Sequence, residues 1–573
     1  KHEPIPYEAF RSHVKHLHAD CDYKFFMEFE GVHEKNKRLT WVQSQKPENQ
    51  MKNRFANVVA YDHSRVVLSL TENDQSSHYI NANYVDTYNA MNAYIATQGP
   101  LAKTISDFWR MIWEQNCRVI VMITNIIEKG RHKCAMYWPT KNRKTENHGP
   151  LTITFVQEET FAYYSIRTFE IKPNKDGTHY TQPMMVKQFH FTGWPDHGAP
   201  EPGFEFPVLD LIMKSTACVV PGTGPLVVHC SAGVGRSGAF IVIDSMIKRI
   251  HDNGDLDIFN FLAHIRNQRN HLVQEECQYI FIHDTLAEYI ACNFVISLPI
   301  KALKDHVRMM RMPISIQPPV KSKLDLEYEV TFGKSFRVTF GNLFYECNLQ
   351  KVTIDNFFSE FDSSRVRLYP RPGEEGSDYI NASYIDGFTR REAFIATQHP
   401  LQSTTMDYWR MIWQENCRSI VMLLSEKEWD KDVFPSYLPA VHDTAHFGDY
   451  EVTMESETAR GDFIIRDLKL ISTKDPSVIR QIRHFHFLHW PEHGQPWSGQ
   501  TVLQLVSKVE EWESEVEKNS HQFDIIGPIV VHCNNGIGRT GVYCALHALW
   551  QQITQEKLVS VYQTAWLQGH QRP

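Results

Sequence analysis

One run decides how the first half of this chain folds: VVHCSAGVGRSG, residues 227–238. Its β-branched start is typical of a buried strand, and the segment from Arg236 onward has helical spacing. Gly233 and Gly235 lie between the two and let the backbone turn tightly. A strand, a tight glycine-rich turn and a helix in this order predict an α/β fold with a functional loop at the end of a central strand.

The turn is predicted to hold an anion. Successive backbone N–H groups and the start of a helix attract negative charge, and the planar guanidinium of Arg236 can bind two phosphate oxygens at once. The same donors stabilise the thiolate of Cys230 and make it a nucleophile. The predicted anion contacts are Ser231, Ala232, Gly233, Val234, Gly235 and Arg236. A free Cys is more often a small buried hydrophobe, but the glycine pair, strand and helix together favour the functional interpretation.

The chain also repeats itself. Residues 95–122 read IATQGPLAKTISDFWRMIWEQNCRVIVM, and residues 395–422 read IATQHPLQSTTMDYWRMIWQENCRSIVM, with 19 of 28 positions identical. VVHCSAGVGRSG likewise has a counterpart in VVHCNNGIGRTG at residues 530–541. Such self-similarity predicts two units of one fold, which we place at residues 1–296 and 297–573.

Composition excludes several classes of protein. Lys+Arg 59 against Asp+Glu 67 gives a net charge of -8, which argues against a nucleic-acid partner. The 11 cysteines form no CxxC pair, which favours a reducing compartment and leaves no zinc spacing, so we expect no metal. No apolar run reaches the length of about 18 residues that spans a bilayer, so we expect no membrane contact within this piece of chain.

The motif HCSAGVGRSG resembles the signature of the phosphotyrosine-specific protein tyrosine phosphatases, and the resemblance covers nearly the whole chain. The duplication resembles the cytoplasmic region of the tandem-domain receptor-type members. The resemblance implies two α/β (α+β) domains, each a twisted mixed β-sheet flanked by helices with a Cys-x5-Arg loop between strand and helix. It also implies phosphotyrosine-containing proteins as substrates, a cysteinyl-phosphate intermediate and no cofactor. The expected location is the cytoplasmic face of the plasma membrane, tethered to a transmembrane segment upstream.

Further catalytic roles follow from the same resemblance. Asp196, in the WPDHG motif, matches the general acid, although Pro, Asp and Gly also make ordinary turns. Gln274 matches the residue that positions the attacking water, with Gln278 second, and Ser237 matches a hydroxyl that bonds the sulfur. The chain departs from the family at Glu275, where Thr is usual, so we expect this carboxylate to weaken affinity or alter the loop.

The resemblance assigns the substrate pocket to four residues. Phe55 stands where a Tyr usually walls the pocket, and its ring keeps the stacking face. Asn57 is placed to contact the peptide backbone. Glu128 matches the carboxylate that orients the loop arginine, and Lys133 matches a lysine that contacts the acid segment, although both fit an ordinary solvated charge run as well.

The second unit is predicted to be a degraded copy. Cys533 and Arg539 survive, but the acid becomes Glu492, whose extra methylene displaces the proton by roughly 1 Å. Asp355 replaces the aromatic wall with a charge that repels a phosphate dianion. The chain also stops at Pro573, before any equivalent of Gln274. We therefore expect a weak or inactive domain, truncated at its C-terminus, that serves stability, regulation or partner binding.

Two other classes of function remain open. A phosphotyrosine-binding scaffold without turnover fits the second unit, whereas the complete set of catalytic residues argues against it for the first. Another thiolate enzyme, such as a rhodanese or an arsenate reductase, leaves Phe55 and the WPD segment without a role.

Overall fold

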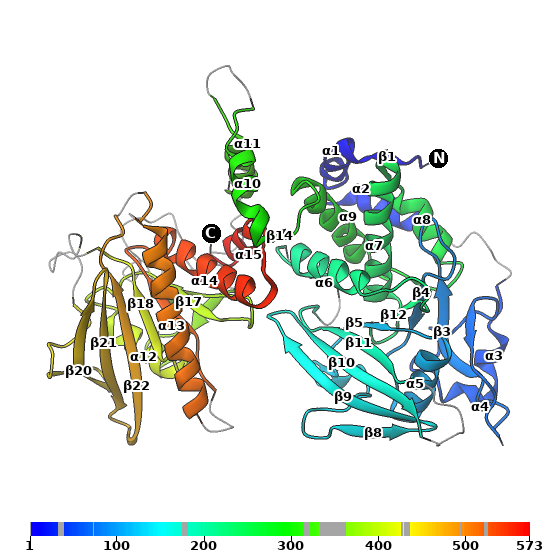
Figure 1. The fold of residues 1–573 in the computed structure, drawn as a ribbon, viewed down its shortest axis with the longest axis horizontal. Helices are drawn as coiled ribbons and strands as arrows, with labels where there is room; N and C mark the ends of the chain where they lie inside the picture. The colour runs from blue at the N-terminus through cyan, green and yellow to red at the C-terminus, as the bar shows by residue number, and fades with distance from the viewer. Residues whose placement is uncertain are drawn as a thin grey trace. The chain divides into compact units, whose positions relative to one another are not determined.

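The chain folds into two compact units, Lys1–Ile296 and Ser297–Pro573 (Figure 1). A computed structural model describes residues 2–32, 39–72, 74–174, 182–195, 198–200, 202–314, 320–332, 363–425, 428, 436–491, 494–496, 498–520 and 525–572. Each unit is built on a nine-stranded mixed sheet with helices packed against it. The predicted α/β class with two tandem domains is confirmed.

The first sheet has a parallel centre and antiparallel flanks. Across the sheet the strands are β2 (Arg65–Val67), β3 (Tyr79–Val85), β4 (Tyr94–Thr97), β12 (Leu226–His229), β5 (Val119–Met122), β11 (Met184–Phe191), β10 (Tyr164–Pro173), β9 (Leu151–Thr160) and β8 (Thr145–His148). His229 lies level with Thr97 and Met122 on the neighbouring parallel strands. The residues after His229 therefore emerge at the carboxyl edge of the sheet, where open α/β sheets place their ligands.

Helices cover both faces of this sheet. They are α1 (Tyr7–Leu17), α2 (Tyr23–Glu30), α3 (Val42–Gln45), α4 (Pro47–Gln50), η1 (Ala102–Thr104), α5 (Ile105–Glu114), α6 (Glu205–Ala217), α7 (Gly235–Asn253), α8 (Ile258–Ile265) and α9 (Glu276–Ala291). Every residue of β12 is buried, as expected for a β-branched strand covered on both sides. Val227 packs with Trp109 and Ile112 of α5 on one face, and α7 contacts β12 and β4.

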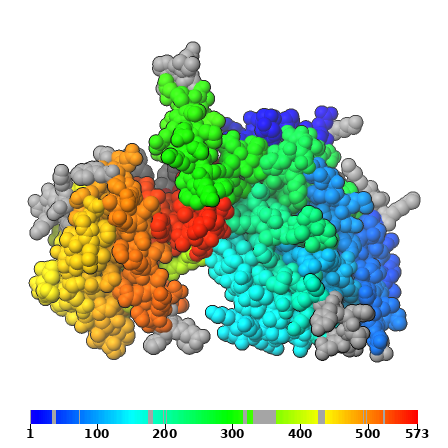
Figure 2. All heavy atoms as spheres, in the orientation of Figure 1, coloured from blue at the N-terminus to red at the C-terminus, as the bar shows by residue number. Residues whose placement is uncertain are grey.

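The first unit closes on itself through its two ends. α1 and α2 pack against α9, so the start and the end of the unit lie side by side, seen as blue and green atoms in Figure 2. Short strand pairs complete the unit: β1 (Ile5–Pro6) with β13 (Asp255–Leu256), and β6 (Ile127–Glu128) with β7 (Arg131–His132). The second of these pairs carries Glu128 toward the centre of the unit, where its side chain is buried.

The second unit repeats this order of strands. Across its sheet they are β15 (Arg365–Arg367), β16 (Tyr379–Ile385), β17 (Phe394–Thr397), β23 (Ile529–His532), β18 (Ser419–Met422), β22 (Asp475–Phe487), β21 (Phe463–Ser472), β20 (Tyr450–Arg460) and β19 (Thr444–Phe447). A further pair joins β14 (Leu298–Pro299) to β24 (Leu558–Val559). β23, the counterpart of β12, is again parallel to both neighbours and buried throughout.

The helices of the second unit also divide between two faces. They are α10 (Ile300–Met310), α11 (Lys323–Phe332), α12 (Thr405–Gln414), α13 (Gly499–Asn519), α14 (Gly538–Glu556) and α15 (Val561–Gln571). Ile420 and Val530 pack with α12 in one hydrophobic cluster, whereas Val421 and Val531 pack with α13 and α14 in another. This alternation is the period-two pattern of strands with two buried faces.

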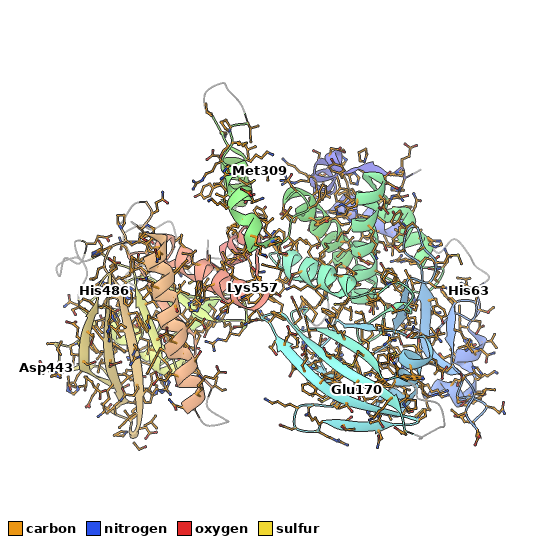
Figure 3. All side chains as sticks on the ribbon, in the orientation of Figure 1. His63, Glu170, Met309, Asp443, His486 and Lys557 are labelled. Atoms are coloured by element: carbon orange, nitrogen blue, oxygen red, sulfur yellow. The ribbon has the colours of Figure 1, made fainter. Side chains whose placement is uncertain are left out.

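A buried network of histidines distinguishes the second unit. The Tyr437 hydroxyl lies 2.8 Å from Nε2 of His484 and 2.7 Å from Nε2 of His532. In the first unit the corresponding Tyr137 hydroxyl lies 2.9 Å from Nε2 of His229, and it accepts a hydrogen bond from the Gln188 amide where the second unit has His484. Burial holds the pKa of His484 and of His532 well below 6.5. The neighbouring His486, labelled on β22 in Figure 3, has a pKa of about 4 for the same reason.

Replacing His484 with Gln should make the second unit less sensitive to acid. Unfolding lets His484 bind a proton with an ordinary pKa near 6.5, so its contribution to stability is lost as the pH falls below that value. One such histidine changes the free energy of unfolding by at most about 1.4 kcal/mol per pH unit. Hydrogen exchange of the β21 and β22 amides at pH 7 and pH 5 measures the difference. His446→Gln, at a largely exposed position, is the control, and equal pH dependence in both variants would contradict the prediction.

Candidate active site

Cys230 lies in the tight turn between β12 and α7. Its side chain is buried, and the Gly233 N–H donates to Cys230 Sγ over 3.2 Å. Gly233 has φ +76°, and a Cβ there would lie 2.0 Å from the Thr97 carbonyl oxygen, so only glycine fits. The turn thus directs a backbone donor at the sulfur, as a thiolate requires.

The buried side chain of Arg269 holds this turn in shape. Its guanidinium donates to the carbonyl oxygens of Gly233, at 2.8 Å, and Ala232, at 3.0 Å, and also to the side chains of Asn81 and Asn83. In a trans peptide the N–H points away from the C=O. Turning these two carbonyls toward Arg269 therefore turns the N–H groups that follow them to the opposite side of the loop. We call that side of residues 230–236, where the N–H groups converge, the cradle. Burial lowers the pKa of Arg269 to about 10, which leaves it charged at neutral pH.

Arg236 is held by a carboxylate that the sequence analysis selected. Its two terminal nitrogens donate to the two oxygens of Glu128 at 2.8 and 2.9 Å, a bidentate pair between buried groups. Nη2 of Arg236 also donates to the Pro195 carbonyl at 2.8 Å. Glu128 in turn accepts from the Asn125 N–H and the Thr124 hydroxyl. These bonds fix the plane of the guanidinium at the cradle.

The charge at the cradle does not come from His229. Burial lowers the pKa of His229 to about 4, so the ring is neutral at pH 7. Its Nε2 lies 2.9 Å from the Tyr137 hydroxyl, which fixes the ring inside the core. Nearby, burial raises the pKa of Cys134 to about 12 and keeps that thiol protonated. The positive and partial positive charges at this turn therefore come from the Gly233 N–H, the N-terminus of α7 and Arg236.

The acid segment is described on both sides of Asp196, which itself lies outside the described residues. Before it, the Pro195 carbonyl accepts from Arg236. After it, the Gly198 N–H donates to Glu275 Oε2 at 2.9 Å, and the Trp194 indole donates to the Gly198 carbonyl at 3.1 Å. Glu275 thus anchors the segment, a role that sequence reasoning missed because the two residues lie 77 positions apart.

The two glutamines lie at the start of α9. The side-chain oxygen of Gln278 accepts from the Gln274 N–H at 3.0 Å, and a Cβ on Gly235 would lie 2.8 Å from the Gln278 side-chain amide, so Gln278 packs against the start of α7. The Gln274 side chain is exposed. The Ser237 hydroxyl is buried and has no hydrogen-bond partner among the described residues.

Phe55 is linked to the cradle by a short chain of hydrogen bonds. Phe55 is 42% exposed, so its ring is accessible to a ligand. The adjacent Arg54 donates through its backbone to the Gln98 side chain and through its guanidinium to the Gly99 carbonyl. The Gly99 N–H then donates to the Ser231 carbonyl at 2.8 Å. The backbone next to Phe55 is therefore connected by hydrogen bonds to the loop that carries Cys230.

The remaining pocket residues are held through their backbones. The Asn57 carbonyl accepts from the Asn270 side chain, while the Asn57 side chain is exposed. The Lys133 carbonyl accepts from the Ser231 hydroxyl at 2.9 Å. Both segments thus contact the region around the cradle, and Asn57 presents its amide to solvent.

The second unit keeps the cradle's charged pair. Cys533 follows β23, and Arg539 lies in the first turn of α14 with its guanidinium on both oxygens of Glu428 at 2.7 and 2.8 Å. Burial opposes ionisation of Glu428, but hydrogen bonds from Arg539 and Ser425 outweigh it, so the pKa of Glu428 lies below its usual range. Glu492 and Asp355, the two replacements expected from sequence, lie outside the described residues.

Among the described residues, no group of three or more His, Cys, Asp or Glu side chains is arranged to hold a metal ion. None of the described helices combines the length and the apolar character needed to cross a bilayer.

Comparison with known proteins places both units in one family. The family model described as protein-tyrosine phosphatase matches residues 49–288 and 355–573, once in each unit. The chain belongs to the protein-tyrosine phosphatase family. Similar proteins include receptor-type tyrosine-protein phosphatase F of Danio rerio and receptor-type tyrosine-protein phosphatase S of Gallus gallus, each 40% identical over 573 residues. Tyrosine-protein phosphatase Lar of Drosophila melanogaster is 40% identical over 576 residues.

All of this chain is covered in each comparison, but only part of each relative. The chain spans 29%, 36% and 27% of these three relatives, respectively. The likeness therefore extends through both units of this tyrosine phosphatase family member, whereas most of each relative lies outside it.

Removing the Glu275 carboxylate should loosen the WPDHG segment of this phosphatase family member. In Glu275→Ala the Gly198 N–H loses its acceptor, so its hydrogen exchange should accelerate by about 10- to 150-fold, since a hydrogen bond to a charged group is worth about 1.5–3 kcal/mol. Glu275→Gln keeps an acceptor oxygen and should exchange more slowly than the Ala variant. Glu276→Ala, on the same turn, serves as the matched control. Unchanged exchange at Gly198 in Glu275→Ala would show that the carboxylate does not hold the segment.

Proposed function

We propose that the first unit hydrolyses phosphotyrosine in proteins through a cysteinyl-phosphate on Cys230. The observation that carries this proposal is the pairing of a buried sulfur under the Gly233 N–H with an Arg236 guanidinium held flat by Glu128. This arrangement suits a tetrahedral dianion above the sulfur, because donors and positive charge converge there without a metal ion. Family membership supports the same reaction.

In the first step the thiolate of Cys230 attacks phosphorus, the S–P bond forms and the bond from phosphorus to the tyrosine oxygen breaks. Asp196 gives its proton to the leaving phenolate. In the second step water attacks phosphorus, Asp196 takes a proton from that water, and the S–P bond breaks to release phosphate and the thiolate. We assign Gln274 to positioning the water and Ser237 to stabilising the departing sulfur.

Arg236 stabilises the charge on phosphorus in both steps. The Glu128 pair prevents the guanidinium from rotating, so little reorganisation is needed in the transition state. The Pro195 contact connects the same guanidinium to the segment that carries the proposed acid. The rigid Arg236 guanidinium thus binds substrate, stabilises charge and contacts the segment that carries the proposed acid.

Selectivity for phosphotyrosine is assigned to Phe55. An aromatic ring stacks on the phenyl ring of the substrate, and phosphoserine offers no such ring. Asn57 presents its exposed amide to the peptide backbone, and Lys133 and Gln278 line the site through the contacts described above.

We assign a weak or absent activity and a regulatory role to the second unit, whose sequence has Glu in place of the acid and Asp in place of the aromatic wall. A phosphotyrosine-binding scaffold is the alternative function for this unit. By similarity to receptor-type relatives, the chain acts at the cytoplasmic face of the plasma membrane, tethered to a transmembrane segment upstream.

Replacing Cys230 with Ser should abolish turnover without abolishing substrate binding. The hydroxyl is a far weaker nucleophile, so kcat for a phosphotyrosine peptide should fall by about 1,000-fold or more. Peptide binding, followed by fluorescence anisotropy, should remain. Cys533→Ser is the matched control and should keep nearly the full rate. If Cys230→Ser retained turnover and Cys533→Ser lost it, the active site would lie in the second unit, and turnover by neither intact unit would favour the scaffold.

Truncating Phe55 should weaken discrimination between phosphotyrosine and phosphoserine peptides. Aromatic stacking contributes about 0.5–1.5 kcal/mol, so kcat/KM for phosphotyrosine should fall by about two- to twelvefold in Phe55→Ala. The rate with phosphoserine peptide should stay the same. Phe55→Tyr, which keeps the ring, should preserve the preference. Equal losses for both peptides would show that Phe55 supports the loop without reading the substrate.

A further inference from the structure

The loop of the second unit differs from that of the first at one side chain that enters the cradle. Asn535 replaces Ala232, and its side-chain oxygen accepts a hydrogen bond from the Ile537 N–H at 3.1 Å. The Cys533 thiol also donates to this oxygen, with Sγ 3.7 Å away. An uncharged but electron-rich oxygen thus contacts both the sulfur and a backbone donor of the loop.

The backbone around this oxygen is still built as a cradle. Arg572 donates to the carbonyl oxygens of Gly536, at 2.8 Å, and Asn535, at 3.2 Å, as Arg269 does for the matching residues of the first unit. Gly536 has φ +74°, and a Cβ there would lie 2.2 Å from the Thr397 carbonyl oxygen. Because each N–H points away from the carbonyl of its own peptide, the Ile537 N–H is directed into the cradle, where it meets the Asn535 oxygen.

The positive charge of the cradle is also present. Arg539 is 6% exposed and remains paired with Glu428 in the same bidentate geometry as the first unit. The hydroxyl of Thr540 is fully buried and takes part in no hydrogen bond among the described residues. The Thr540 hydroxyl is a buried donor without a partner in the described part of the chain, and it is next in sequence to Arg539. Such a donor indicates a polar site that the side chains of the second unit fill only in part.

We propose that the second unit retains a site for a tetrahedral oxyanion, and that the Asn535 side chain closes this site by acting as a stand-in for one ligand oxygen. An oxyanion must displace the Asn535 oxygen from the Ile537 N–H before it can bind, and it must also accommodate the displaced amide. Removing that side chain removes both costs. The inference rests on the proposed function for its interpretation of the loop as a phosphate cradle, and it makes Asn535, together with the replacement of the acid by Glu492, a cause of the weak or absent activity proposed for the second unit.

Tungstate, a tetrahedral oxyanion, tests this on the whole chain by isothermal titration calorimetry. Asn535→Ala, which restores the residue of the first unit, should bind one more tungstate per chain than the wild type. Asn535→Asp keeps an oxygen at the same position and adds a repelling charge, so it should gain no site. Asn534→Ala changes the neighbouring side chain and should likewise gain none. Asn535→Gly provides a second opening variant, and near-ultraviolet circular dichroism checks that each variant is folded.

The outcomes separate the two proposals. If the wild type binds no tungstate at the first unit, the proposed function of Cys230 is undermined, yet a gain of one site in Asn535→Ala still supports the closed second cradle. If the Ala and Gly variants fold and bind the same number of tungstate ions as the wild type, the inference is wrong. It is also wrong if Asn535→Asp gains the site, since its oxygen would then not be what closes the cradle.

Discussion

A guanidinium that binds loop carbonyls is the constraint on which each site depends. Arg269 holds the carbonyl oxygens of Ala232 and Gly233, and the planar peptide then forces the following N–H groups in the opposite direction. An anion cradle needs those N–H groups to point toward one another, although their partial positive charges repel. Without support, the peptide planes of the turn would rotate and separate them. Arg269 therefore fixes the loop between Cys230 and Arg236, the two residues that the proposed function requires to act on one ligand.

Arg269 and Arg236 thus have different roles. Arg269 is fully buried and satisfied by amide and carbonyl oxygens, so its charge stabilises the loop from behind. Arg236 is neutralised in part by Glu128, which limits its attraction for an anion but fixes its geometry. Burying an ion pair costs a large desolvation free energy, and what the Arg236–Glu128 pair provides is a fixed orientation of the guanidinium. Because His229 is neutral, its ring contributes no charge to the turn that carries Cys230.

Sequence alone predicted what local pattern and repetition encode. The two units, the strand before Cys230 and the helix after it follow from β-branched runs, glycines and self-similarity, and the carboxylate partner of Arg236 was available through resemblance. The roles of Arg269 and Glu275 could not be predicted from the sequence. They depend on how the segments after α8 and at the start of α9 pack against the loop and the WPDHG segment. The link between Glu275 and Gly198 is a tertiary contact, and nothing in the neighbouring residues of either one signals it.

The comparison of the two units shows which features the fold retains when the site changes. Arg572 repeats the carbonyl contacts of Arg269, and Glu428 repeats the pair of Glu128, although the loop between them has acquired Asn535. Losing Arg269 or Arg572 would leave loop carbonyl oxygens without donors, and each such oxygen would lower the free energy of unfolding by about 1–3 kcal/mol. A new side chain inside the cradle leaves these backbone hydrogen bonds intact. A substitution inside the cradle therefore costs the fold little stability, whereas the arginines that support the loop contribute to that stability.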